Sequence, residues 1–277
     1  REIRLERALK GTDVPHAELV AADETGEVLG KPFYLMKEVD GWSPMEGGWE
    51  SPFDTDLEAR RDLAFQLIEG GAAKLGRVDW KAQGGLEGGF GKPDGFHDRQ
   101  VDRWLSFLAS FKVRELPGLD IASEWLRNNR PAHYTPGIMH GDYQFANVMY
   151  AHGAPGRLAA IVDWEMTTIG DPLLDVAWAL LGYDGGEHPK ETGFYLPMDG
   201  MPTRSELLAH YEKGQRVGMR EHPLLPGAGQ LEARHRAGED VRGGRQRRQG
   251  RPPQGGRGVR GNGARPDRDR RPVGTVR

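Results

Sequence analysis

The sequence contains no cysteine, which excludes disulfide bonds and thiolate metal sites from the whole chain. It also lacks any apolar run of the roughly 18–20 residues that a membrane-spanning helix requires, and residues 1–4 lack the pattern of a signal peptide. These absences fit a cytoplasmic protein with no membrane partner. The chain has 277 residues, 37% of them hydrophobic and 8% aromatic, which suffices for one large domain or two lobes around a cleft.

Lysine and aromatic residues are missing from the last part of the chain. Residues 231–277 hold 14 Arg, 10 Gly, 4 Pro and five acidic residues, a balance of +9, which leaves about −12 for residues 1–230. Because so little apolar surface is available for burial, residues 223–277 are predicted to form a disordered Arg/Gly-rich tail.

Two origins of this tail stay open. Guanidinium groups neutralise phosphates, so the tail is a candidate for binding nucleic acid, whereas the acidic residues 1–230 are a poor match for such a ligand. Nucleic-acid-binding tails of this kind often carry stacking aromatics, and none occurs here. The total absence of Lys beside abundant Arg favours a frameshift product of GC-rich DNA.

Helical periodicity occurs in several parts of the chain. Apolar residues recur at helical spacing within three segments, residues 1–9, 63–75 and 101–111. Asp171-Pro172 predicts the start of a further helix, whose apolar body Leu173–Leu181 is expected to be buried. Thr203 and Glu206 have the spacing of a capping box and predict another helix.

Strand patterns are short and lie among the helices. Residues 17–22 and 33–39 flank a turn at 23–26 and predict a hairpin. Three further strands are expected at residues 138–139, 148–150 and 158–162, and the glycine-rich residues 83–96 are expected to be a loop. Strands first and helices later, with a small hairpin inserted among the helices, predict an α+β protein of two lobes.

One segment, residues 140–147 (HGDYQFAN), concentrates polar side chains between strands. An apolar strand delivers Asp142 into a tight loop that Asn147 closes, and the hairpin that follows turns at 153–156 and ends at Asp163. We therefore expect Asp142, Asn147 and Asp163 at the same end of one small sheet. Two carboxylates and an amide oxygen suit Mg²⁺, and phosphoryl transfer needs such a metal and a group that orients the attacking hydroxyl.

These residues resemble the H-G-D-x-x-x-x-N catalytic loop and the metal-binding Asp of the aminoglycoside phosphotransferase and choline kinase family, a small-molecule branch of the protein-kinase-like fold. The resemblance implies ATP and Mg²⁺ as cofactors. It implies that Asp142 is the catalytic base and that His140 supports the loop. It further implies that Asn147 and Asp163 hold the metal.

The resemblance extends to the nucleotide site. Residues 33–41 (FYLMKEVDG) are similar to the family's hinge, which implies that the backbone of Met36, Lys37, Glu38 and Val39 faces adenine. Glu2 stands where the family places a helix glutamate that pairs with a phosphate-binding lysine. An ordinary glutamate in the first turn of a helix is an equally good interpretation of this position.

Three other motifs point to one branch of the family. Residues 78–80 (VDW), 99–104 (RQVDRW) and 170–175 (GDPLLD) are similar to the kinase-like domains associated with acyl-CoA dehydrogenases, although Gly76 stands where that branch has His. The branch implies a small-molecule hydroxyl acceptor of the hydroxyacyl-CoA type, with aminoglycosides and amino alcohols ranked below it.

The resemblance covers roughly residues 1–215 and implies a protein-kinase-like two-lobe fold. Residues 1–41 would be the remnant of the N-lobe with the hinge, and residues 42–222 the mostly helical C-lobe with the catalytic β-hairpin. The first strands, the glycine-rich loop and the phosphate-binding lysine have no counterpart in the sequence, so the chain as written is expected to be poorly active or inactive. A catalytically inactive nucleotide-binding remnant therefore stays open as an alternative.

Some residues are expected to be structural. Asp175 and Trp178 are interpreted as structural because they lie in the apolar helix after Pro172. Five histidines show no metal-ligand spacing and are expected on the surface or in loops: His16, His97, His133, His210 and His222.

Overall fold

The computed structural model describes residues 1–181, 183 and 196–214, all within a unit that runs from Arg1 to Leu231. The tail predicted for residues 223–277, and with it His222 as the last residue before the tail, lies outside the described residues. Among the helices that are described, none is long and apolar enough to cross a membrane.

A helix and a hairpin form the N-terminal part, as the sequence predicted. Helix α1 (Glu2–Leu9) buries Leu5 and Leu9, and strand β1 (Leu19–Asp23) pairs antiparallel with β2 (Phe33–Met36). Asp23 organises the turn because its carboxylate accepts hydrogen bonds from the backbone N–H groups of residues 25, 26 and 28. The bond from residue 28 and those from Thr25 and Gly26 hold the pKa of Asp23 at about 2.

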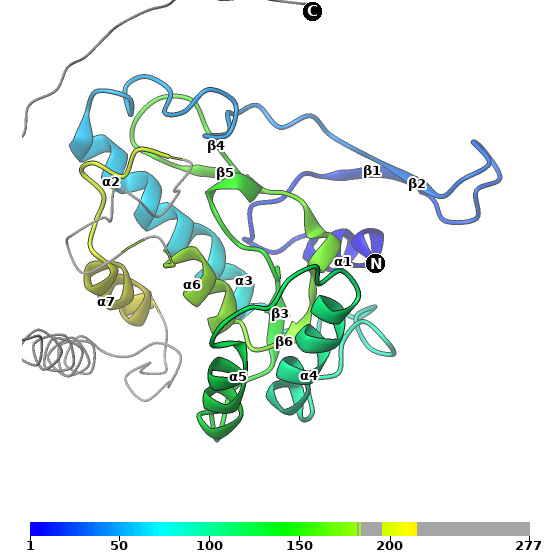
Figure 1. Ribbon diagram of the computed structural model, residues 1–277. Coiled ribbons are helices and arrows are strands. Elements are labelled where there is room, and N and C mark those ends of the chain that lie inside the picture. Colours follow the sequence, from blue (N-terminus) through cyan, green and yellow to red (C-terminus); the bar gives the residue numbers. More distant parts are fainter. Residues whose placement is uncertain (182, 184–195, 215–277) are drawn as a thin grey trace, which may run out of the picture. The chain divides into compact units, whose positions relative to one another are not determined.

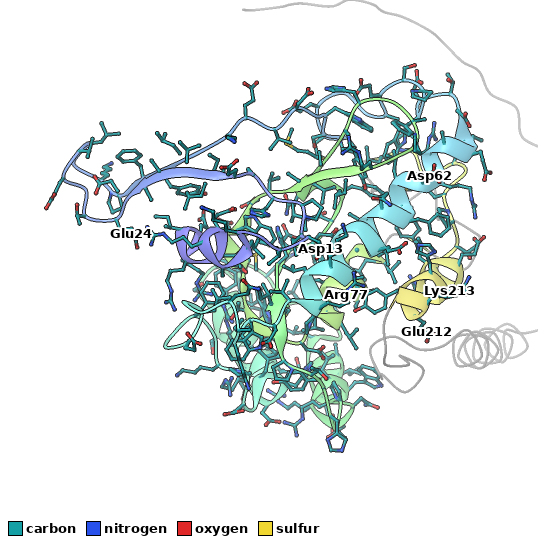
Figure 2. The ribbon with its side chains drawn as sticks, turned by 180° about the vertical axis from the view of Figure 1, so that it is seen from behind. Asp13, Glu24, Asp62, Arg77, Glu212 and Lys213 are labelled. Carbon is teal, nitrogen blue, oxygen red and sulfur yellow. The ribbon has the colours of Figure 1, made fainter. Side chains whose placement is uncertain are left out.

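A continuous helix runs through the centre of the fold. It consists of α2 (Leu57–Phe65), the π-helical η1 (Gln66–Ala73) and α3 (Lys74–Arg77), and Figure 2 labels Asp62 and Arg77 near its two ends. Asp56 caps its start by accepting hydrogen bonds from two backbone N–H groups. The sequence pattern predicted a helix over residues 63–75 but contained no sign that its middle turns would be π-helical.

Two tyrosine hydroxyls from residues 143–150 bind this helix. Tyr143 donates a hydrogen bond to the carbonyl of Leu67 at 2.6 Å, and Tyr150 donates one to the carbonyl of Leu63 at 2.8 Å. Both tyrosines are fully buried. The rings thus fasten the loop to the helix, and Tyr143 lies where Gly71 has no side chain.

Two separate two-stranded ladders lie beside the central helix (Figure 1). Strand β3 (Gly137–Met139) pairs with β6 (Thr168–Gly170), and β4 (Val148–Tyr150) pairs with β5 (Leu158–Ile161). Strand β6 was not predicted. The expectation of one small sheet was therefore wrong, because β3 pairs with a later strand rather than with the β4–β5 hairpin.

The remaining helices surround this centre. Helices α4 (Phe96–Ala109) and α5 (Leu119–Asn128) lie together beneath β3 and β6, and α7 (Arg204–Gly214) contacts α2 and η1 (Figure 1). The predicted capping box of α7 is confirmed, since Thr203 Oγ1 accepts from the Glu206 N–H at 3.2 Å and the Glu206 carboxylate accepts from the Thr203 N–H at 2.7 Å.

Helix α6 (Leu173–Ala179) departs from its prediction. Its sequence suggested burial on all sides, but Trp178 and Leu181 are exposed while Val176 and Ala179 are buried. The N-cap of the helix is Pro172 and not the predicted Asp171, although the Asp171 carboxylate accepts from the N–H of Leu173 at 3.1 Å. One face of α6 packs on η1, and the exposed Trp178 is free to reach the loop that follows β3.

Candidate active site

The loop after β3 depends on a glycine. Gly141 has φ +92°, and a Cβ at this position would lie 2.7 Å from the backbone oxygen of Met166. Only glycine adopts this conformation at such a close approach without strain. The loop then closes through the short helix η2 (Phe145–Asn147), which leads directly into β4.

Three side chains donate hydrogen bonds to the carboxylate of Asp142. Trp178 Nε1 and Gln144 Nε2 each lie 2.8 Å from Oδ1, and Asn147 Nδ2 lies 3.0 Å from Oδ2. Asn147 Nδ2 also donates to the backbone oxygen of Asp142 at 2.8 Å. The structure therefore brings Asp142 and Asn147 together and fixes the orientation of both.

His140 joins the two strands that carry the acidic residues. Its Nε2 donates to the carbonyl of Val162 at 2.7 Å, and its Nδ1 accepts from the N–H of Asp142 at 3.2 Å. Burial lowers the pKa of His140, which keeps the ring neutral as these two bonds require. The ring thus links the loop of Asp142 to the residue before Asp163.

Asp175 of α6 holds the backbone of the same loop. Its two carboxylate oxygens accept from the N–H of His140 at 2.6 Å and from the N–H of Gly141 at 2.9 Å. Asp175 is almost completely buried, and this burial raises its pKa to about 7 even though the two bonds act in the opposite direction.

Replacing Asp175 with Asn is expected to remove a pH dependence of stability. An acid whose pKa is raised by folding binds its proton more tightly in the folded state, so its contribution is complete below pH 4 and is lost as the pH rises to 7. The wild-type free energy of unfolding, relative to the variant, is expected to fall by about 1.4 kcal/mol per pH unit across this window. Denaturant unfolding at pH 4 to 8 measures the difference.

The matched control for this experiment is Asp13→Asn, since Asp13 is an exposed loop acid labelled in Figure 2. Its pH dependence is expected to match the wild type. Parallel curves for wild type and Asp175→Asn would contradict the assignment of a raised pKa to Asp175.

Asp163 follows β5 and has an unusual backbone. It is the one non-glycine residue with positive φ (63°) in the described part of the chain, and its carboxylate has no hydrogen-bond partner among the described residues. It precedes the short helix η3 (Trp164–Met166) without capping it. Hydrogen bonding of the Val162 N–H to the Asn147 carbonyl at 3.0 Å places Asp163 and Asn147 at the same end of the β4–β5 hairpin.

The donor set suits a magnesium ion that is shared with a phosphate ligand. With its Nδ2 directed at Asp142, the Asn147 side chain leaves Oδ1 without a hydrogen-bond partner among the described residues. No three His, Cys, Asp or Glu side chains converge into a metal site within the described ranges. Mg²⁺ usually takes one or two protein ligands and completes its shell with phosphate and water, so the side chains of Asn147 and Asp163 fit this ion.

The predicted hinge residues lie at and directly after the end of strand β2. Met36 ends β2, and Lys37 pairs with Glu18 through its backbone N–H at 2.9 Å and through its side chain. The backbone groups of Glu38 and Val39 have no hydrogen-bond partner among the described residues. They are available to a ligand, in the manner that the hinge resemblance implies.

Glu2 has a partner that the sequence did not suggest. Its carboxylate accepts a hydrogen bond from the hydroxyl of Tyr34 on β2. Burial, the bond to Glu2 and the nearby charges of Glu6 and Asp163 raise the pKa of Tyr34. The structure thus brings Glu2, Tyr34 and Asp163 into one region, although Glu2 contacts a tyrosine in place of the lysine that the resemblance implies.

Glu6 was not predicted as a notable residue. Its side chain is 2% exposed, its Oε2 has no hydrogen-bond partner within the described part of the chain, and burial followed by the charge of Glu2 raises its pKa to about 7. The sequence signal was its position, one helical turn after Glu2 and between the buried Leu5 and Leu9. Spacing alone could have indicated that Glu6 points inward.

Two further expectations concern Asp175 with Trp178 and His97. Asp175 and Trp178 were interpreted as structural, and both bind the loop of Asp142 directly, Asp175 at its backbone and Trp178 at the Asp142 carboxylate. His97 was expected on the surface, yet its side chain is mostly buried and pairs with Asp171 at 2.8 Å. The apolar pattern of residues 173–181 concealed these roles, because contacts between α6 and the loop depend on tertiary packing.

Comparison with known proteins identifies the family. A sequence model described as the phosphotransferase enzyme family matches residues 1–213. The chain belongs to this family. A solved structure from Ralstonia eutropha, described as an aminoglycoside phosphotransferase, is 29% identical to this chain. The two structures superpose with a TM-score of 0.64, and the match covers 77% of this chain and 64% of that one. A type VIII aminoglycoside-3′-phosphotransferase, 20% identical with a TM-score of 0.50 over 80% of this chain and 74% of its own, shares the fold.

Relatives of this phosphotransferase-family chain include longer proteins. Acyl-CoA dehydrogenase family member 10 of Mus musculus is 29% identical over 184 residues, and family member 11 of Gallus gallus is 30% identical over 186 residues. Each match covers 66% of this chain, which spans 16% and 23% of the relatives' own lengths. The predicted family resemblance and the protein-kinase-like α+β fold are thereby confirmed.

Proposed function

We propose that the protein is a Mg-ATP-dependent phosphotransferase that moves the γ-phosphoryl group to a hydroxyl of a small molecule. The observation that carries this proposal is the arrangement around Asp142. Its carboxylate accepts from Asn147 Nδ2, while the amide oxygen of Asn147 and the carboxylate of Asp163 have no hydrogen-bond partner among the described residues. A fixed carboxylate beside Asn147, and the uncommitted oxygens of Asn147 and Asp163 at one end of the β4–β5 hairpin, support a base and a metal site in this phosphotransferase-family chain.

Each residue has a defined part in the proposed reaction. Asp142 orients the acceptor hydroxyl and takes its proton. As the acceptor oxygen bonds to the γ-phosphorus, the bond from that phosphorus to the bridging oxygen of ATP breaks and ADP leaves. Asn147 and Asp163 would hold Mg²⁺, which supplies positive charge to the phosphates, and His140 keeps the loop of Asp142 beside the strand of Asp163.

The nucleotide base has a natural place beside the hinge. Adenine presents one donor and one acceptor along the edge that kinase-like hinges bind. The backbone of Glu38 and Val39 offers the complementary groups, which have no partner among the residues that the structure describes. Lys37 acts in this proposal through its position after Met36, since its side chain pairs with Glu18 at the surface.

For the acceptor, we propose a hydroxyl of the hydroxyacyl-CoA type. The support is similarity to the acyl-CoA dehydrogenase family members, of which the chain spans only a part. A screen of the full-length protein with γ-labelled ATP against hydroxyacyl-CoA, aminoglycoside and amino-alcohol acceptors tests this choice. Label in a CoA ester supports it, and label only in another acceptor class overturns the acceptor while keeping the reaction. Nucleotide binding with no transfer would favour the inactive remnant.

Replacing Asp163 with Asn is expected to weaken the use of Mg²⁺. Loss of a metal ligand should raise the Mg²⁺ concentration for half-maximal activity by about 10-fold or more, because even residues that only support ligands cost 10–100-fold in metal affinity. Rates measured across a Mg²⁺ titration check this. Glu165→Gln, two residues on and exposed, is the control and should keep the wild-type titration. An unchanged titration for Asp163→Asn would remove Asp163 from the metal site.

A further inference from the structure

The exposed side chain of Trp178 makes a hydrogen bond that burial of the ring does not impose. Its side chain is 48% exposed, so burial contributes little to holding the ring, yet its indole N–H points at the carboxylate of Asp142 with Nε1 2.8 Å from Oδ1. An exposed indole N–H can bond to water at no cost. Its bond to a carboxylate is charge-assisted and therefore stronger than a bond to water.

The donors around Asp142 are unequally divided between its two oxygens. A carboxylate has about four lone-pair sites, two on each oxygen. Oδ1 accepts from both Trp178 Nε1 and Gln144 Nε2, so its sites are filled. Oδ2 accepts from Asn147 alone among the described residues, which leaves one site open.

We propose that Trp178 is a positioning residue that saturates Oδ1 of Asp142 together with Gln144, so that Oδ2 is the oxygen that receives the proton of the acceptor hydroxyl. This inference rests on the proposed role of Asp142 as the base. Without the indole N–H, Oδ1 keeps only the bond from Gln144. The carboxylate is then held less firmly against rotation about its Cβ–Cγ bond, and the direction of the open lone pair is less tightly fixed.

Helix α6 holds the loop of Asp142 at two points. One turn earlier, Asp175 accepts from the backbone N–H groups of His140 and Gly141. The same helix thus fixes the backbone before Asp142 through one residue and the carboxylate of Asp142 through another. Packing of α6 against η1 holds both anchors in place relative to the core.

The contact itself can be tested without any activity. In ¹⁵N-tryptophan-labelled full-length protein, the Trp178 indole signal is identified by its loss in Trp178→Phe. Asp142→Ala is expected to move this signal upfield, because the hydrogen bond to the carboxylate is gone, and to leave the Trp104 signal in place. A Trp178 signal that does not move would overturn the proposal.

The kinetic consequence is a split between kcat and KM. Trp178→Phe is expected to lower kcat about tenfold, since small misplacements of a reacting group cost up to 10²-fold, with the KM for ATP and the melting temperature unchanged. Trp178→His keeps a ring N–H at similar reach and should recover part of the loss. Trp104→Phe is the matched control, equally exposed at 48% and with no hydrogen bond to its indole N–H among the described residues.

The outcomes separate the two proposals. If the wild-type protein transfers no phosphate to any acceptor, the proposed function fails, and the indole signal still decides whether Trp178 holds the carboxylate. If the wild type is active and Trp178→Phe keeps the wild-type kcat, the positioning role alone is refuted.

Discussion

Replacing Asp142 with Asn is expected to lower kcat by about 10²–10⁴-fold, the range that a general base contributes. Asn has nearly the same shape but cannot take a proton. Its amide group also conflicts with its surroundings, because Trp178, Gln144 and Asn147 all present N–H donors to this side chain. One of these donors must face the new NH₂ group. Steady-state kinetics with the best acceptor from the screen measures the loss.

Two controls show whether that loss of kcat comes from the missing base. Nucleotide affinity and melting temperature of Asp142→Asn are expected to stay close to the wild type, since Asp142 contacts the loop and not the hinge. Asp120→Asn removes an exposed acid at the start of α5 and should leave kcat unchanged. If Asp142→Asn kept more than a tenth of the wild-type kcat, another group would have to be the base.

The largest expected effect on stability comes from Gly71→Ala. A Cβ on Gly71 would lie 1.7 Å from the hydroxyl oxygen of Tyr143 and 2.9 Å from Cδ2 of Leu158. Tyr143 cannot move away, because its ring is fully buried and its hydroxyl binds Leu67. Overpacking of this kind costs about 1–3 kcal/mol or more, so the melting temperature is expected to fall by about 5–10 °C.

The neighbouring glycine provides the matched control. Gly70 lies in the same π-helical segment, and the nearest atoms to a Cβ there belong to the Gln66 side chain, whose amide end can move at the expense of a long 3.4 Å hydrogen bond from the Leu158 N–H. Gly70→Ala is therefore expected to leave the melting temperature unchanged or to raise it, because Ala favours helix over Gly. Thermal unfolding of both variants compares them directly. Equal melting temperatures would show that the Tyr143 ring is not tightly packed against Gly71.

Gly71→Ala also tests the link between the helix and the loop. Since Tyr143 is the residue after Asp142, a displaced ring would shift the loop, and a loss of activity at temperatures where the variant is folded is expected. Both tyrosine hydroxyls bind this helix, Tyr143 at the carbonyl of Leu67 in η1 and Tyr150 at the carbonyl of Leu63 in α2.

Local patterns in the sequence were sufficient for most elements. Apolar residues at helical spacing predicted α1 and α4, and two strand-like runs that flank a turn with Asp and Gly predicted the β1–β2 hairpin. The capping box of α7 was readable because Thr203 and Glu206 act on each other's backbone within one turn. These features depend on neighbours in the chain, so the sequence contains all that is needed to predict them.

The sequence by itself also determined the family, because the spacing of His140, Asp142, Asn147 and Asp163 is a property of the chain. Only the tertiary structure decided that β3 pairs with β6 and that Trp178 reaches Asp142. The physical reason is the distance along the chain between the residues that meet. Each of these contacts joins residues separated by many positions, and its partner is chosen by how helices and strands pack, which no local pattern records.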